Sequence, residues 1–171
     1  MIDESAFYLV PGLARTYAPR GDRPILRPFL TRDHLSAISG VTPTGHLYTH
    51  VSEHAFTNFD VALFVEHLVE QVGGPLLLIW DGSPIHHGPS LNSLLAKIGP
   101  DQVLMERLPA YAPELNPDEG VWDYLKQTEL PNVSCISLRQ LRGTLHRAIM
   151  RLRSKPDLIL SFFEGAGLSL E

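Results

Sequence analysis

Residues 1–10, MIDESAFYLV, place three polar residues in a largely apolar segment that is expected to form a strand. Because side chains alternate between the two faces of a strand, Asp3, Ser5 and Phe7 share one face and Glu4 lies on the other. An aspartate inside a strand is unusual, because its charge is costly to bury and its preference for strands is low. Asp3 is therefore either a charge on an edge strand or a functional residue.

Two further strands are expected at residues 34–41 and 46–51, which flank a Thr-Pro-Thr-Gly turn. Between the first strand and this hairpin, residues 11–24 contain several prolines and glycines, which favour an extended loop. The first three strands are thus predicted to be antiparallel neighbours.

The spacing of apolar residues changes to a helical period after residue 57. Thr57 and Asp60 are placed to cap a helix that ends at the glycine pair 73–74. Its apolar face comprises Val61, Phe64, Leu68 and Val72. Residues 75–81 then form a nearly all-apolar strand of the kind buried on both faces, with Asp81 at its end.

The remaining segments continue this alternation of helix and strand. A helix is expected from about Pro89 to Gly99, a fifth strand at 102–108, and two more helices at 137–154 and 157–165. Residues 1–171 show no internal repeat or linker, and their number suits a single core. The order of elements predicts one α/β domain with a mixed sheet flanked by helices.

Composition places the chain among ordinary globular proteins, with 44% hydrophobic and 19% charged residues. Its one cysteine, Cys135, excludes an internal disulfide, and no apolar run is long enough for a bilayer, so we expect a cytoplasmic protein without membrane contact. A net charge of −5 does not fit a stand-alone nucleic-acid binder. Two arginine-rich segments, at 15–32 and 139–153, are either solvated surfaces or contacts with DNA phosphates, and the first is also a candidate contact with a second subunit.

The segment Asn116-Pro-Asp-Glu-Gly has a complete structural explanation. Asn116 is a good N-cap, Pro117 suits the first helical position, and Glu119 stands where a capping-box glutamate reaches back to the cap. On this local pattern Glu119 is more readily a capping residue than a catalytic one.

Three carboxylates in separate elements favour a second interpretation, because Asp3, Asp81 and Glu119 can converge in a folded chain. Asp81 also has a structural reading, as the first residue of a turn. Converging carboxylates repel one another unless cations lie between them, and oxygen ligands suit Mg²⁺ or Mn²⁺. Two such ions can clamp a phosphodiester, which is nuclease or phosphoryl-transfer chemistry.

The motifs IDESAF, RTYAPRG, LLLIWDGSPIHH and YAPELNPDEGVWDYLK resemble the catalytic domain of bacterial insertion-sequence transposases allied to the mariner superfamily. The resemblance covers residues 1 to about 130 and is most specific in the last motif. It implies a mixed five-stranded sheet of the ribonuclease H-like type. It also implies a DDE triad of Asp3, Asp81 and Glu119 that binds two Mg²⁺ or Mn²⁺ ions, with His86 as a contact to phosphate or attacking water.

The implied activity is metal-dependent cleavage and strand transfer of DNA, with transposon ends and target DNA as partners and a homodimer as the active complex. The family carries helix-turn-helix modules before the catalytic domain, whereas Asp3 stands near the first residue here. We therefore expect the DNA-reading part to be absent. The chain is then either a catalytic fragment or the second open reading frame of an element whose first frame encodes a separate N-terminal DNA-reading polypeptide. Two features depart from the family pattern. Gly82 stands where asparagine is common in the family, and the interval from Asp81 to Glu119 is slightly longer than in the best-known mariner relatives.

Two other functions remain open at this stage. One is a non-catalytic relic, or a regulatory or dimerising fragment, with the same fold. The presence of the complete triad argues against this alternative. The other is a hydrolase with a histidine metal site formed by His86, His87 and either His50 or His54, although HExxH and paired-cysteine spacings are lacking.

Overall fold

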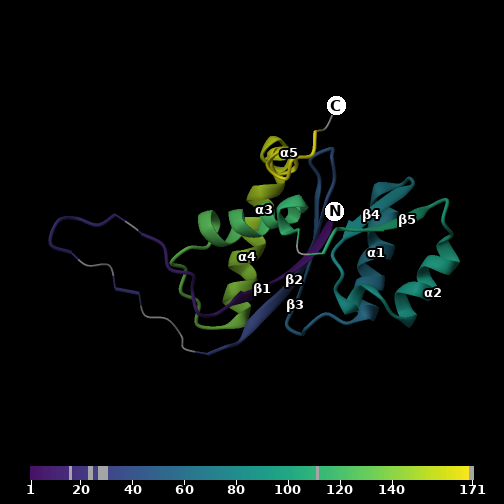
Figure 1. Cartoon of the computed structure of the whole chain (residues 1–171). Helices are drawn as coiled ribbons and strands as arrows, with labels where there is room; N and C mark the ends of the chain where they lie inside the picture. Colours follow the sequence, from purple (N-terminus) through teal and green to yellow (C-terminus); the bar gives the residue numbers. More distant parts are fainter. Residues whose placement is uncertain (16, 23–24, 27–30, 111, 170–171) are drawn as a thin grey trace.

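The computed structural model describes residues 1–15, 17–22, 25–26, 31–110 and 112–169 (Figure 1). The strands are β1 (Ile2–Tyr8), β2 (His34–Val41), β3 (Leu47–Ser52), β4 (Leu76–Trp80) and β5 (Val103–Arg107). The α-helices are α1 (Asn58–Val72), α2 (Pro89–Ile98), α3 (Pro117–Asp123), α4 (Leu138–Arg153) and α5 (Pro156–Gly165). A π-helical segment, Tyr124–Glu129, continues α3. The predicted order of strands and helices is confirmed.

The first three strands form an antiparallel sheet in the order β1-β2-β3, as predicted. Asp3 lies opposite Ser39 on β2, and Ser39 lies opposite Thr49 on β3. The turn between β2 and β3 uses Gly45 at a φ of 78°, a left-handed conformation that glycine adopts without steric cost. Strands β4 and β5 form a separate parallel pair.

The predicted single five-stranded sheet is not confirmed: the described residues form one sheet of three strands and one of two. β1 and β4 are in contact, but no backbone ladder joins them. A cavity of about 870 Å³ lies between the two sheets and is lined by Ile2, Val41, Leu76 and Leu78, among others. Strand patterns specify which residues face a core, whereas edge pairing also requires side-chain packing that brings two backbones within bonding distance.

Helix boundaries are set by local capping interactions, including the predicted one at Thr57. Thr57 and Asp60 form a reciprocal capping box at the start of α1, and Gly73 ends the helix at a φ of 69°. Ser137 caps α4 by accepting a hydrogen bond from the Gln140 N–H. These local interactions explain why the helix limits could be predicted closely.

Helices cover both faces of the three-stranded sheet. Figure 1 shows α3, α4 and α5 on one side of β1 and β2, and α1 and α2 on the other side with β4 and β5. Phe7 of β1 belongs to the core beneath α3 and α4, whereas Ile2 belongs to the core beneath α1. This confirms the predicted alternation of β1, because residues an odd number apart face opposite sides of a strand.

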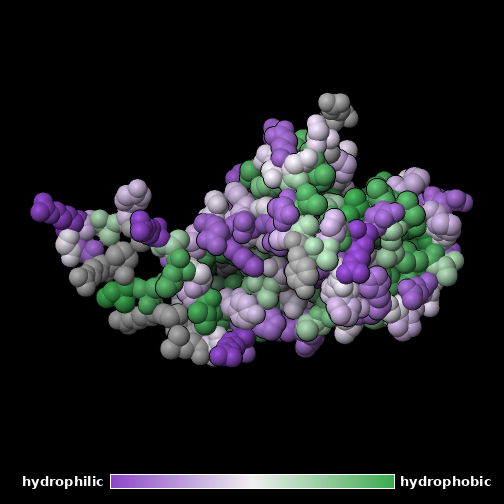
Figure 2. All heavy atoms as spheres, in the orientation of Figure 1, coloured by the Kyte–Doolittle hydropathy of each residue, from purple (hydrophilic) through white to green (hydrophobic). Residues whose placement is uncertain are grey.

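Strand β4 is not buried on both faces, which corrects the prediction. Leu78 and Trp80 are buried, but the preceding residue, Leu77, is 53% exposed, and Leu104 of β5 is 54% exposed. Hydrophobic side chains accordingly gather over the β4–β5 end of the molecule in Figure 2. The apolar composition of β4 did not reveal this, because helices cover only one face of the β4–β5 pair.

The arginines of α4 mostly bind the protein itself. Arg142 donates to the Val51 carbonyl and Arg153 to the Leu47 carbonyl, which satisfies the outer edge of β3. Arg151 pairs with Glu129. The prediction that this helix binds DNA phosphates is therefore not supported by Arg142, Arg151 or Arg153.

In the first arginine-rich segment, Arg15, Arg20 and Arg32 are exposed. Its other two arginines, Arg23 and Arg27, lie outside the described residues. No helix of the described chain has the length and apolarity to cross a bilayer.

Candidate active site

Asp3 projects from β1 toward α3, where its carboxylate is held by two donors. The Glu4 N–H donates to Oδ1 at 2.9 Å and the Trp122 indole N–H donates to Oδ2 at 3.1 Å. Trp122 is buried, and its ring also meets Phe7 edge to face. Trp122 thus combines a core role with a polar one, because a buried indole N–H needs an acceptor.

The environment of Asp3 disfavours its charge. Burial raises its pKa to about 7, and the negative charges of Glu119 and Glu4 contribute to the rise, while its hydrogen bonds oppose it. The interaction with Glu119 shows that these two carboxylates, distant in sequence, lie near each other. A carboxylate that is costly to ionise beside other acids is a suitable ligand for a cation.

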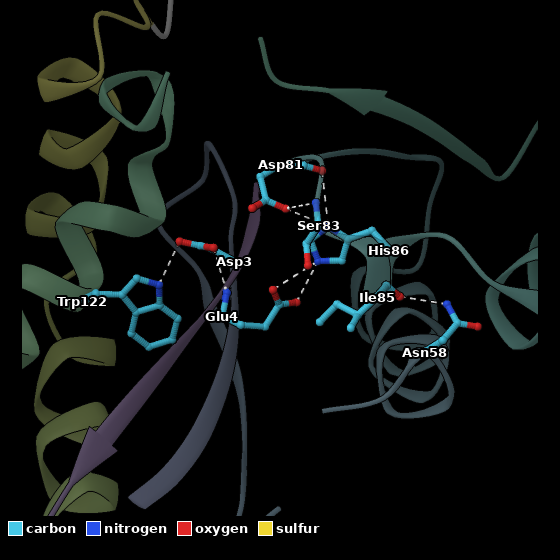
Figure 3. A network of polar contacts seen from close by, with 8 residues as sticks. All are labelled: Asp3, Glu4, Asn58, Asp81, Ser83, Ile85, His86 and Trp122. Atoms are coloured by element: carbon cyan, nitrogen blue, oxygen red, sulfur yellow. Dashed lines mark hydrogen bonds and ion pairs between the residues drawn. The ribbon is translucent and has the colours of Figure 1, made fainter. Parts of the chain in front are cut away.

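Asp81 follows β4 directly and opens the turn into the next helical segment, as the sequence indicated. Its Oδ1 accepts the Ser83 N–H at 2.8 Å and lies 3.0 Å from Nδ1 of His86 (Figure 3). The side chain is 55% exposed. Within the described structure, Oδ2 has no hydrogen-bond partner, so this oxygen is open to a ligand.

His86 is buried between two carboxylates. Its ring stacks on Trp80 with 4.5 Å between centroids, and Nε2 lies 3.0 and 3.1 Å from the two carboxylate oxygens of Glu4. Burial lowers the pKa of His86, but Glu4 and Asp81 outweigh that effect, so the pKa lies above its usual value. A protonated ring donates one N–H to each carboxylate and links β1 to the end of β4.

Glu4 is the site residue that sequence reasoning missed. It was expected on the opposite face of β1 from Asp3, which is correct, and that face is where His86 lies. Figure 3 shows Asp3 and Glu4 leaving β1 on either side, with Glu4 directed to His86. The available signal was an acid at an inward position of a strand, since such a charge needs a partner.

Glu119 stands in the first turn of α3 and is exposed. Asn116 caps this helix by accepting the Asp118 N–H at 3.2 Å, as predicted. The reciprocal half of the predicted capping box is not formed within the described structure, unlike at α1. The capping interpretation of Glu119 is therefore wrong, and its carboxylate remains directed to solvent near Asp3.

The neighbouring acid, Asp118, is fully buried and occupies a different environment. Ser39 Oγ donates a short hydrogen bond to its Oδ1, and Oδ2 has no partner among the described atoms. Burial raises the pKa of Asp118 to about 7, which the nearby Met1 ammonium and Ser39 only partly offset. Adjacent residues of one helix thus differ completely, because consecutive side chains point about 100° apart.

The donor chemistry of this site fits a divalent cation. Asp3, Asp81 and Glu119 supply only carboxylate oxygens, and the mutual repulsion of Asp3 and Glu119 would be relieved by a cation. As the side chains stand, however, no three acids, histidines or cysteines of the described residues are close enough together to hold a metal ion. This also removes support for the histidine metal site, since His86 is engaged by Glu4 and Asp81.

Comparison with known families gives one match, over residues 1–142, to the family described as "DDE superfamily endonuclease". The match includes Asp3, Asp81, His86 and Glu119. A search of curated proteins found no match.

Solved structures show the same fold at low sequence identity. A pre-cleavage Mos1 transpososome matches at 14% identity with a TM-score of 0.65, over 99% of this chain and 56% of that one. The Mos1 mariner paired-end complex with Mn matches at 16% identity with a TM-score of 0.60, also over 99% and 56%. The Mos1 transposase catalytic domain with raltegravir and Mn matches at 12% identity with a TM-score of 0.50, over 81% and 78%. The chain thus spans little more than half of the first two.

Proposed function

Because the chain belongs to the DDE superfamily endonuclease family, we propose that it is the catalytic domain of a transposase. The reaction is cleavage of DNA at the ends of a mobile element, followed by transfer of the freed strand to target DNA. The observation that carries this proposal is the proximity of Asp3 and Glu119. They lie 116 positions apart in the sequence, yet the negative charge of Glu119 contributes to the raised pKa of Asp3.

Asp3, Asp81 and Glu119 are the residues that would hold Mg²⁺ or Mn²⁺. When bound, such ions activate the attacking oxygen and stabilise the leaving oxygen of a phosphodiester. The protein contributes the placement of its carboxylates: Trp122 orients Asp3, and Ser83 and His86 orient Asp81. The fully engaged, buried His86 suits a positioning role better than the direct phosphate contact suggested by the resemblance.

Glu4 and His86 act as one positioning unit in this proposal. The negative charge of Glu4 raises the pKa of the imidazole and so favours the protonated ring, whose Nδ1–H can donate to Asp81. With Oδ1 of Asp81 occupied in this way, Oδ2 is the oxygen presented to a cation. The partners proposed for the site are transposon-end and target DNA, with a homodimer as the active assembly.

A plasmid-nicking assay tests the function. Purified protein is incubated with supercoiled DNA and Mn²⁺, and nicked product is measured for the wild type, Asp81→Asn, Glu119→Gln and the exposed control Glu114→Gln. We expect metal-dependent nicking that Asp81→Asn and Glu119→Gln abolish and Glu114→Gln retains. Nicking that persists unchanged in Asp81→Asn would refute the assignment.

A non-catalytic relic is the second candidate, and it is favoured by the lack of an assembled three-ligand cluster in the described residues. Calorimetric titration with Mn²⁺ separates the two. Binding that disappears in Asp3→Asn and Glu119→Gln supports the enzyme. No heat of binding to the wild type supports the relic.

A further inference from the structure

Arg107 emerges beside Asp81 at the ends of two parallel strands. It is the last residue of β5 and pairs with Trp80, the last residue of β4. The Leu108 N–H continues the ladder with a 2.8 Å hydrogen bond to the Trp80 carbonyl. Since parallel strands end at the same edge, Arg107 and Asp81 leave the β4–β5 pair together, at the edge where α/β proteins place their ligands.

The glycine after Asp81 makes room for this arginine. A Cβ atom added to Gly82 would overlap the guanidinium group of Arg107, so the guanidinium lies directly against the Gly82 backbone. Gly82 has no positive φ that would itself require glycine. The small residue is therefore explained by the closeness of Arg107 and not by the turn.

The guanidinium in this position has unused donors. Arg107 is exposed and, within the described part of the chain, makes no hydrogen bond or ion pair. By contrast, Arg142, Arg151 and Arg153 of α4 are all bound to protein groups. A guanidinium presents a planar fork of donors that matches the oxygens of a phosphate.

We propose that Arg107 binds a backbone phosphate of the DNA strand positioned at Asp81, and that Gly82 keeps the space that the guanidinium needs. The inference rests on the proposed function, because it takes DNA as the substrate of this site. Arg107 offsets the acidic surroundings of Asp81, which would otherwise repel the phosphate backbone.

The test is the salt dependence of DNA binding, measured by fluorescence anisotropy with a labelled duplex in EDTA, where no cleavage occurs. Each lost phosphate contact reduces the slope of log K against log salt concentration by about 0.9 for duplex DNA. We expect Arg107→Gln to weaken DNA binding and to reduce the slope by the amount of about one phosphate contact. Arg107→Lys should retain most of the wild-type slope. Thermal unfolding of each variant establishes that the fold is intact.

Two further variants locate the effect. Lys97→Gln, at an exposed lysine on α2 outside both arginine-rich segments, changes the net charge equally and should leave the slope at its wild-type value. Gly82→Ala displaces the guanidinium, so as a single substitution it should reduce the slope. Added to Arg107→Gln, it should reduce the slope no further. An unchanged slope in Arg107→Gln, or an equal reduction in Lys97→Gln, overturns the inference even if wild-type nicking is found. A wild type that neither binds nor nicks DNA overturns both this inference and the proposed function.

Discussion

Replacement of the buried Asp118 by asparagine should stabilise the protein, and by more at high pH than at low pH. Asp118 is fully buried, and one of its oxygens accepts from Ser39 while the other has no partner among the described atoms. Asparagine retains an oxygen for Ser39 and carries no charge. The substitution therefore removes the cost of an ionised group in the interior.

The magnitude follows from the pKa of Asp118, which rises from 3.8 to about 7 in the folded protein. At about 1.4 kcal/mol per pKa unit, ionisation of Asp118 lowers the free energy of unfolding of the wild type by about 4 kcal/mol as pH rises from below 4 to above 7. The sign is that of a carboxyl whose folded pKa is raised: its stabilising effect is present at low pH and lost as pH rises through about 7. An unpartnered amide N–H group in the variant costs about 1–3 kcal/mol, so the net gain at pH 9 is about 1–3 kcal/mol.

Urea unfolding at pH 5 and pH 9 in EDTA measures this difference, with fluorescence of the buried Trp80 and Trp122 as the signal. Asp123→Asn is the matched control, because Asp123 is an exposed acid on the same helix and should change stability by less than about 0.5 kcal/mol. Subtracting the wild-type value at each pH cancels the titrating groups that do not interact with Asp118. A stability difference for Asp118→Asn that is equal at the two pH values would refute the reasoning.

Three further substitutions test other parts of the structure. Thr57→Ala removes the cap of α1 and should cost about 1 kcal/mol in urea unfolding, and an unchanged midpoint would contradict a role for the capping box. Gly45→Ala places a Cβ 2.9 Å from Pro156 at a φ of 78°, so we expect a loss of more than about 1 kcal/mol and a lower Tm. Trp122→Phe removes the indole donor to Asp3, which should raise the Asp3 pKa further and weaken Mn²⁺ binding at neutral pH. Titration calorimetry would detect the weaker binding, and wild-type affinity in Trp122→Phe would show that the hydrogen bond does not orient Asp3.

Local patterns in the amino-acid sequence determined the secondary structure and the faces of its elements. Thr57 and Gly73 delimit α1 because capping depends on residues within one turn. Asp3 and Phe7 share a face of β1 because side chains alternate along any strand. These properties depend on neighbours in the chain, so they could be predicted before the structure was known.

Tertiary structure alone decided which polar groups meet and how far the sheets approach. The exposed Glu119 and the buried Asp118 are consecutive acids whose environments differ because of what packs against α3. The link from Glu4 through His86 to Asp81 joins residues from separate strands, and the gap between β1 and β4 depends on side chains from both sheets. Such arrangements are set by distances between elements, which no local pattern of residues specifies.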